Sequence, residues 1–310
     1  EKNEYKPINK LYVLKDCIVL PPEDIVLDAD ENEVWIEIYK FWKANVLIDE
    51  DSLAVLTAYT YLSWFYDSME SVPYLLILGG LGTAKTRILE IAGILCFNAT
   101  FLGTAVTSAN IFRLQDIAKG TLMIDEFERN QTDRSSSITQ ILNSGYRKSG
   151  AVLRCEPKTN EPIPYDTYGP KIIATRSIPE DDALVSRCII VRVDNKSVDE
   201  LKNSNIPLDM TPEIRVKAEI LRGKLIGLRF RLADKKSQNN NLKFTSQRPR
   251  DRQILSSLIS AQPVNMQSFL AQIIERKLLN KHMSVRLQLE CEIARVICGR
   301  IEVDNNNLPI

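Results

Sequence analysis

The stretch of sequence that decides the fold is Pro73-Tyr74-Leu75-Leu76-Ile77-Leu78-Gly79-Gly80-Leu81-Gly82-Thr83-Ala84-Lys85-Thr86. Its five consecutive apolar residues, Tyr74 to Leu78, have the length and character of a buried parallel strand. A glycine-rich turn follows, and apolar residues with helical spacing come after Thr86. A strand, a glycine-rich loop and a helix in this order form a cradle for phosphate, because backbone N–H groups and the helix N-terminus converge on an anion.

The residues of this loop have expected roles in binding ATP and Mg²⁺. Lys85 would supply a positive charge to the phosphates, and the Thr86 hydroxyl would be a ligand of Mg²⁺. Ala84 stands where the usual pattern has glycine, and a ligand-free turn between a core strand and a core helix is the alternative. The expected nucleotide contacts are Gly79, Gly80, Leu81, Gly82, Thr83, Ala84, Lys85, Thr86 and Asp125.

Two further apolar segments, 121–124 and 171–175, end in polar residues. The carboxyl ends of parallel strands line the ligand crevice of an open sheet, so these residues are expected near the phosphate loop. Asp125 would share Mg²⁺ with Thr86, and Glu126 would polarise the attacking water. Thr175 would bond the γ-phosphate or that water. An acidic turn after a strand and a strand-end cap are the respective alternatives.

An arginine and a predicted hairpin complete the pattern. Arg187 directly precedes the apolar run 188–193, where it is either a surface ion-pair partner or an arginine finger acting on a neighbouring subunit. Two short segments around a polar turn, within 151–168, predict a β-hairpin. Its Arg154 and its tip residue Lys158 are candidates for contacting the phosphate backbone of DNA in a ring with a central pore, although a tip lysine is usually just solvated.

Composition limits the function classes. The formal net charge is zero, so nucleic-acid binding would depend on a local basic surface. No apolar run approaches the roughly 18 residues of a membrane span, and Glu1 to Glu4 show no signal-peptide pattern, so we expect a cytoplasmic protein without a membrane partner. Six cysteines without a C-x-x-C pair and a single histidine, His282, argue against a zinc site.

The combination of motifs resembles the minichromosome maintenance (MCM) branch of AAA+ ATPases over about residues 70–260. That branch typically has alanine before the lysine, as 81–86 does, and 120–127 resembles its second motif. Residues 138–150 resemble the segment before its pre-sensor hairpin, and 185–188 resemble its arginine-finger motif. The segment 252–259 resembles its second sensor helix, which implies Arg252 as a sensor arginine.

The resemblance implies an AAA+ P-loop core with a parallel sheet flanked by helices and a pre-sensor β-hairpin. We expect lead-in strands and helices over 1–70, the α/β ATPase core over 71–195, and a small, mainly helical lid with the C-terminal segment over 196–310. The implied activity is ATP-driven translocation on single-stranded or forked DNA during replication. A homo-oligomeric ring, expected to be a hexamer, would hold ATP between Lys85 of one subunit and Arg187 of the next, with other replication proteins as candidate partners.

Three departures separate the chain from the usual MCM pattern. Thr175 stands where the branch has asparagine, and 99–120 is too short for its helical insertion. Its N-terminal oligonucleotide-binding domain and zinc element are absent from these residues. The chain is therefore more similar to a divergent MCM-like or superfamily 3-like helicase of a plasmid, phage or other mobile element in a host cytoplasm. One alternative is an AAA+ regulator or remodeller that acts on a protein partner without helicase activity, and another is an initiator or nucleotide switch that hydrolyses ATP slowly.

The sequence makes one assignment that kinetics can test directly. Glu126→Gln keeps the shape of the side chain but removes the carboxylate that would polarise water, so single-turnover ATP hydrolysis should fall by roughly 100-fold or more. ATP binding should persist, because the phosphate loop is unchanged. Hydrolysis at the wild-type rate would contradict the role assigned to Glu126.

Overall fold

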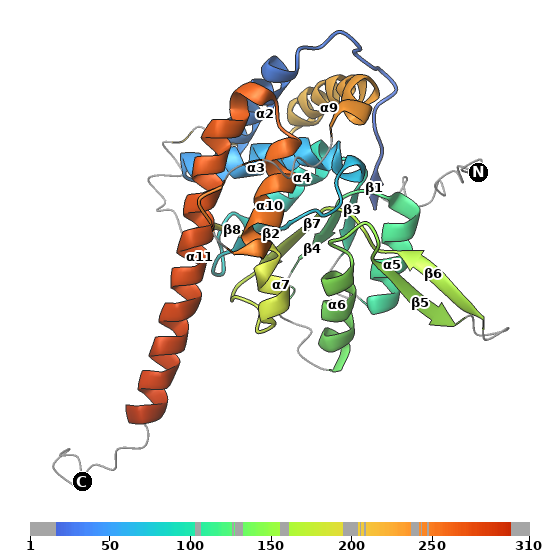
Figure 1. The fold of residues 1–310 in the computed structure, drawn as a ribbon. Helices are drawn as coiled ribbons and strands as arrows, with labels where there is room; N and C mark the ends of the chain where they lie inside the picture. Colours follow the sequence, from blue (N-terminus) through green and yellow to red (C-terminus); the bar gives the residue numbers. More distant parts are fainter. Residues whose placement is uncertain are drawn as a thin grey trace.

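The computed structural model describes residues 17–102, 107–125, 127, 133–155, 161–194, 204, 206, 207, 209–236, 242, 244–246 and 248–298. Its centre is a mainly parallel sheet with the strand order β1-β3-β4-β7-β2-β8, in which β1 pairs antiparallel with β3 (Figure 1). The strands are β1 (Ile18–Val19), β2 (Tyr74–Leu78), β3 (Ala99–Leu102), β4 (Leu122–Ile124), β7 (Lys171–Thr175) and β8 (Cys188–Arg192). The predicted α/β fold with a parallel sheet is confirmed at this level, and it is consistent with a P-loop-like core.

Helices cover both faces of the sheet, which explains why successive residues of β2 are all buried. Leu75 and Ile77 face a core built with α2, α3, α4, α9, α10 and α11, whereas Leu76 and Leu78 face a second core built with α5, α6 and α7. The helices are α2 (Glu31–Asn45), α3 (Glu50–Ser63), α4 (Lys85–Leu95), α5 (Ser108–Ala118), α6 (Asp133–Ser144), α7 (Asp182–Ser186), α9 (Pro212–Leu232), α10 (Pro249–Ser260) and α11 (Val264–Cys298).

The expected division of the chain into a lead-in, an ATPase core and a lid stays a prediction. The lead-in contributes β1 and two helices, α2 and α3, whose first turns are capped by Asp30 and Asp49. The C-terminal part is mainly helical, but its last helix, α11, runs for 35 residues and extends well beyond the sheet (Figure 1). Within the described ranges, no helix combines the length and apolar character needed to cross a membrane.

The predicted β-hairpin is present as β5 (Ala151–Cys155) and β6 (Pro162–Asp166), which pair antiparallel and project beside α5 (Figure 1). Stacking against α5 holds it in place. The ring of Tyr165 lies 4.6 Å from the ring of Phe112, and the Arg154 guanidinium lies 5.5 Å from the same Phe112 ring. The hairpin tip, including Lys158, lies outside the described residues.

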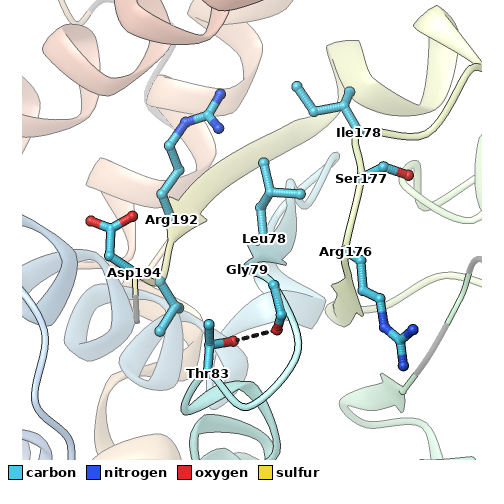
Figure 2. A pocket seen from close by; sticks show the side chains of 10 residues that line it. Leu78, Gly79, Thr83, Arg176, Ser177, Ile178, Arg192 and Asp194 are labelled. Atoms are coloured by element: carbon cyan, nitrogen blue, oxygen red, sulfur yellow. Dashed lines mark hydrogen bonds between the residues drawn. The ribbon is translucent and has the colours of Figure 1, made fainter. Parts of the chain in front are cut away.

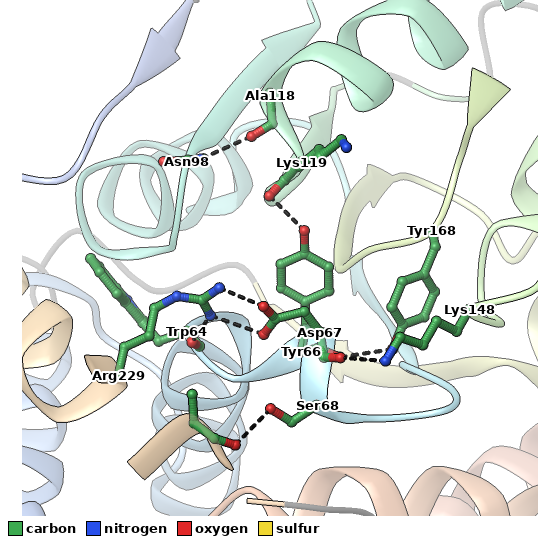
Figure 3. Close-up of polar contacts among 11 residues, drawn as sticks. Trp64, Tyr66, Asp67, Ser68, Asn98, Ala118, Lys119, Lys148, Tyr168 and Arg229 are labelled. Carbon is green, nitrogen blue, oxygen red and sulfur yellow. Dashed lines mark hydrogen bonds and ion pairs between the residues drawn. The ribbon is translucent and has the colours of Figure 1, made fainter. Parts of the chain in front are cut away.

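A short turn, η1 (Tyr66–Ser68), joins the hairpin base to the helical C-terminal part (Figure 3). The carboxylate of Asp67 accepts two hydrogen bonds from the Arg229 guanidinium of α9. Lys148, just before β5, donates to the Asp67 carbonyl at 2.8 Å. Tyr168, just after β6, donates to the Tyr66 carbonyl at 2.8 Å. Both chain segments at the hairpin base therefore bind the turn that α9 holds.

A buried lysine anchors the same region from the sheet side. Lys171, the first residue of β7, is fully buried, and its ammonium donates to the carbonyls of Gly145, Thr167 and Gly169 at 3.3, 2.7 and 3.0 Å. It also lies 4.9 Å from the Tyr74 ring. Burial lowers the pKa of Lys171 to about 7, and the negative charge of Asp166 partly opposes this effect.

The lowered pKa of Lys171 makes stability depend on pH. Between about pH 7 and pH 10 the unfolded chain binds this proton more tightly, so the free energy of unfolding should rise with pH by up to about 1.4 kcal/mol per pH unit. Lys171→Met keeps the length of the side chain without its charge and should lose this rise in urea titrations across the window. Lys40→Met, at an exposed position of α2, is the control. An unchanged slope in Lys171→Met would contradict the assignment.

Candidate nucleotide-binding site

The loop between β2 and α4 needs glycine at two positions. A Cβ atom at Gly79 would lie 2.6 Å from the Val193 carbonyl oxygen and 2.7 Å from Thr83 Oγ1, closer than packed atoms approach. Gly82 has a φ of +72°, in the left-handed region that favours glycine. A Cβ atom at Gly80 would meet nothing within 4 Å. The loop therefore packs tightly against β8 at one side and is open at the other.

The ammonium of Lys85 is hydrogen-bonded to backbone carbonyl groups of this loop. Lys85 Nζ donates to the carbonyl oxygens of Gly79 and Gly80 at 2.6 and 2.5 Å and lies 3.3 Å from Thr83 Oγ1. Thr83 Oγ1 in turn donates to the Gly80 carbonyl at 3.0 Å. These bonds hold the positive charge at the loop, where phosphate oxygens could replace the carbonyl acceptors.

Helix α4 begins at Lys85, so its first turn forms one wall of the loop. The N-cap residue is Ala84, whose methyl side chain cannot accept hydrogen bonds from the first N–H groups of the helix. The unsatisfied donors and the positive end of the helix dipole favour an anion here. A cradle of this shape and charge fits a nucleotide phosphate. Thr86 lies in the first turn of the same helix, directly after Lys85.

Strand register brings two more predicted residues to this edge. Leu78 of β2 pairs with Thr175 of β7, and Ile173 of β7 pairs with Ile124 of β4, which Asp125 follows. The backbone N–H of Gly79 donates to the Thr175 carbonyl at 3.2 Å. Thr175 therefore ends the strand next to the loop strand, and Asp125 follows the end of the strand beyond it. One carboxylate with a hydroxyl, completed by phosphate oxygens and waters, suits the preferences of Mg²⁺.

The hydrogen bond made by the Thr175 hydroxyl limits the contacts that this side chain can make with a phosphate or a water. The side chain is 1% exposed, and its Oγ1 donates to the Ser177 carbonyl at 2.8 Å. A hydroxyl has one proton, so this oxygen can accept a hydrogen bond from a water, but it would have to break the bond to Ser177 to donate to a phosphate. The bond is also what a strand-end cap would make, which was the alternative from the sequence.

Arg187 lies at the opposite edge of the sheet. Cys188, which follows it, pairs with Tyr74 at the start of β2, whereas the phosphate loop follows Leu78 at the end of that strand. Five residues of β8 separate Arg187 from the loop edge, which is roughly 16 Å of extended chain. Arg187 therefore cannot reach the phosphate loop of its own chain. The prediction that it acts on another subunit stays open, and this geometry is compatible with it.

The remaining predicted residues are not gathered at the loop. Arg252 is exposed on α10, where its Nε donates to the Ser246 carbonyl at 2.8 Å. Arg154 is exposed on the hairpin. Glu126 lies outside the described residues. The roles predicted for these three residues therefore stay predictions.

An open cleft of about 450 Å³ adjoins the loop, within the size range of small-molecule sites (Figure 2). It lies between the end of β8, with Arg192 and Asp194, and the segment after β7, with Arg176 and Ser177. Sequence reasoning missed these four residues. The signal was available, because all of them lie at or just after the carboxyl ends of the strands predicted at 171–175 and 188–193.

Comparisons with known proteins give little further guidance. No protein-family model matches the chain, and no curated protein matches it. Among solved structures, it is similar to a structure of JCV helicase with a bound small molecule, at 14% sequence identity and a TM-score of 0.37. The match covers 82% of this chain and 62% of the helicase chain, so the chain spans less than two thirds of that protein. Similarity this low carries no functional conclusion.

The two glycines at the start of the loop form a matched pair for mutagenesis. Gly79→Ala should lower the free energy of unfolding by about 1–3 kcal/mol and weaken ATP binding, because the added methyl group pushes the loop away from Val193. Gly80→Ala should change stability by less than about 0.5 kcal/mol, because its methyl group meets open space. Thermal unfolding compares the two variants. Equal losses in both would contradict the described loop.

Proposed function

We propose that this chain is an ATP-hydrolysing P-loop protein of the AAA+ class and a DNA translocase or helicase of the MCM-like or superfamily 3-like group. The observation that carries the proposal is the shared edge of β4, β7 and β2, where Asp125, Thr175 and the phosphate loop lie side by side. The strand order supports the proposal, because β7, which ends in Thr175, lies between β2, which leads into the phosphate loop, and β4, which leads to Asp125. Replication of a mobile element in a host cytoplasm is the proposed setting.

In the proposed reaction, the loop binds and orients the phosphates of ATP. The N–H groups of the loop and of the first turn of α4 donate to phosphate oxygens, and Lys85 exchanges its carbonyl acceptors for them. Thr86 and Asp125 would hold Mg²⁺, which would supply charge neutralisation at the phosphates. Glu126 orients the attacking water, and the lone pairs of Thr175 Oγ1 accept a hydrogen bond from it. Arg252 stays the sensor arginine predicted from the resemblance.

The distance between the two edges of the sheet favours a ring. Arg187 lies roughly 16 Å from the loop of its own chain along β8, so an arginine finger at this position must serve a neighbouring subunit. Each subunit would then contribute Lys85 to one ATP and Arg187 to the next. Closed head-to-tail rings repeat one interface in this way, and a hexamer is the proposed form.

The projecting hairpin is the proposed contact with single-stranded or forked DNA. Leu153 and Arg154 are exposed on β5, and stacking on Phe112 holds the hairpin at a defined angle to α5. In a ring, hairpins that project from each subunit would bring Arg154 and Lys158 to a common pore. Contacts of this kind read phosphates and carry little sequence information. Candidate partners are other replication proteins.

Strand displacement tests this proposal. The wild-type protein should unwind forked DNA only with ATP and Mg²⁺, and Lys85→Ala should abolish unwinding. Single-stranded DNA should stimulate the wild-type ATPase, and the double variant Arg154→Ala, Lys158→Ala should lose that stimulation because two cationic contacts with the strand are gone. Lys43→Ala, an exposed lysine on α2, is the control. An ATPase that DNA never stimulates would favour a remodeller of protein partners.

A further inference from the structure

Three arginines surround the ring of Tyr146 at the edge of the sheet opposite the phosphate loop. The guanidinium carbons of Arg187, Arg250 and Arg147 lie 4.6, 4.7 and 5.4 Å from the ring centroid. Arg187 directly follows α7, Arg250 belongs to the first turn of α10, and Tyr146 and Arg147 follow α6. Three separate parts of the chain thus bring cations to one aromatic side chain, which is itself only 7% exposed.

The charge of this cluster is poorly balanced. Within the described parts of the chain, none of the three arginines forms an ion pair. Asp181, whose charge acts on Arg187, is already used by α7 and α6, because its carboxylate accepts from the N–H of Leu184 and from Asn143. Burial and the nearby charge of Arg250 lower the pKa of Arg187. Like charges held this close repel each other, and an anion would offset the repulsion.

Arg187 also has a hydrogen-bond donor that the protein leaves unmet. Its Nε is buried and has no acceptor among the described residues, although its Nη1 donates to the Ala183 carbonyl. An unsatisfied buried donor on a charged group is destabilising. A phosphate group suits this position, because guanidinium groups donate to its oxygens in pairs at short distances.

Both the backbone and the side chain of Tyr146 are held by hydrogen bonds. The Tyr146 backbone carbonyl accepts from the Val72 N–H at 2.8 Å, and the Tyr146 hydroxyl accepts from Arg250 Nη1. Arg250 donates from the same nitrogen to Gln253 Oε1 at 2.9 Å, within α10. Next to Val72, the hydroxyl of Ser71 lies 3.0 Å from the hydroxyl of Ser257, which ties α10 to the start of β2. The two guanidinium groups nearest the ring therefore keep a defined geometry.

We propose that Tyr146 is a positioning residue that aligns Arg187 and Arg250 as one joint site for a phosphoryl group, the terminal phosphate of a nucleotide bound by a neighbouring copy of this chain. This inference rests on the proposed function, since the phosphate loop of the same chain lies roughly 16 Å away. It adds Arg250 and Tyr146 to the reaction. Arg252, two residues further along α10, points about 200° around the helix from Arg250 and bonds Ser246 instead.

Steady-state ATPase kinetics with a separate measurement of ATP affinity test this assignment. Arg250→Ala should lower kcat by about 100-fold while the Kd for ATP changes by less than about threefold, because the loop that binds ATP belongs to another subunit. Tyr146→Leu should lower kcat by about 10-fold or more, and Tyr146→Phe, which keeps the ring but loses the bond from Arg250, should have a kcat between those of Tyr146→Leu and the wild type. Arg252→Ala in the same assay tests the sequence prediction independently.

Mixed assemblies separate a catalytic defect from a folding defect. Arg250→Ala subunits keep an intact phosphate loop, and Lys85→Ala subunits keep an intact arginine cluster. Mixing the two should therefore recover ATPase activity at the interfaces that combine the intact halves, which a misfolded subunit could not do. No recovery despite confirmed co-assembly would overturn the inference.

Two other results would also overturn the inference about the arginine cluster, and a third would reject the proposed function on which it rests. Wild-type kcat in Arg250→Ala, within a protein that hydrolyses ATP, would remove Arg250 from the site. Loss of single-stranded DNA binding in Arg250→Ala and Tyr146→Leu, with unchanged basal ATPase, would assign the cluster to phosphates of DNA instead. A wild-type protein without any ATPase activity would reject the proposed function itself.

Discussion

The parallel pairing of β2 with β7 and β8 is the constraint on which the rest of the structure depends. It aligns Leu78 with Thr175 on one side and with Arg192 on the other, so the ends of these strands meet the phosphate loop at one edge of the sheet. The same pairing sends Arg187 to the opposite edge. A strand of five residues is long enough to separate the two groups beyond the reach of any side chain. Under the proposed function, one chain therefore carries two halves of a site that a second chain would complete.

The hairpin is connected to this sheet through buried polar contacts, not through the hairpin strands themselves. Lys171 donates to carbonyls after α6 and after β6. Asp67 accepts hydrogen bonds both from Lys148, which lies just before the hairpin, and from Arg229 of α9. The contacts of Lys171 are buried and those of Arg229 are partly buried, whereas that of Lys148 is exposed, so the first two are the costly ones to break. A shift of β7 or α9 would therefore move the hairpin base as a unit.

The sequence predicted the features that depend on local pattern. The strand at 74–78, the loop, the helix after it and the hairpin at 151–168 follow from apolar runs and glycines within short windows, and all are present. The position of Thr175 beside the loop followed from the general rule about strand ends. The choice between Arg250 and Arg252 as neighbour of Arg187 could not be predicted. It depends on which side of α10 faces the sheet, and the contact between Ser257 and Ser71, which are 186 residues apart in the chain, helps to set that orientation.

The arginine cluster also links assembly to nucleotide binding. A guanidinium that is half buried, repelled by Arg250 and left with an unmet donor makes the isolated subunit less stable than it would be with an anion at that place. If the anion is the phosphate of a neighbour's ATP, association of subunits removes this cost only when ATP is bound. Linkage is reciprocal, so association must then strengthen ATP binding by the same factor by which ATP strengthens association. In this proposal, the repulsion between Arg187 and Arg250 lies at the surface that the ATP of a neighbouring subunit would contact.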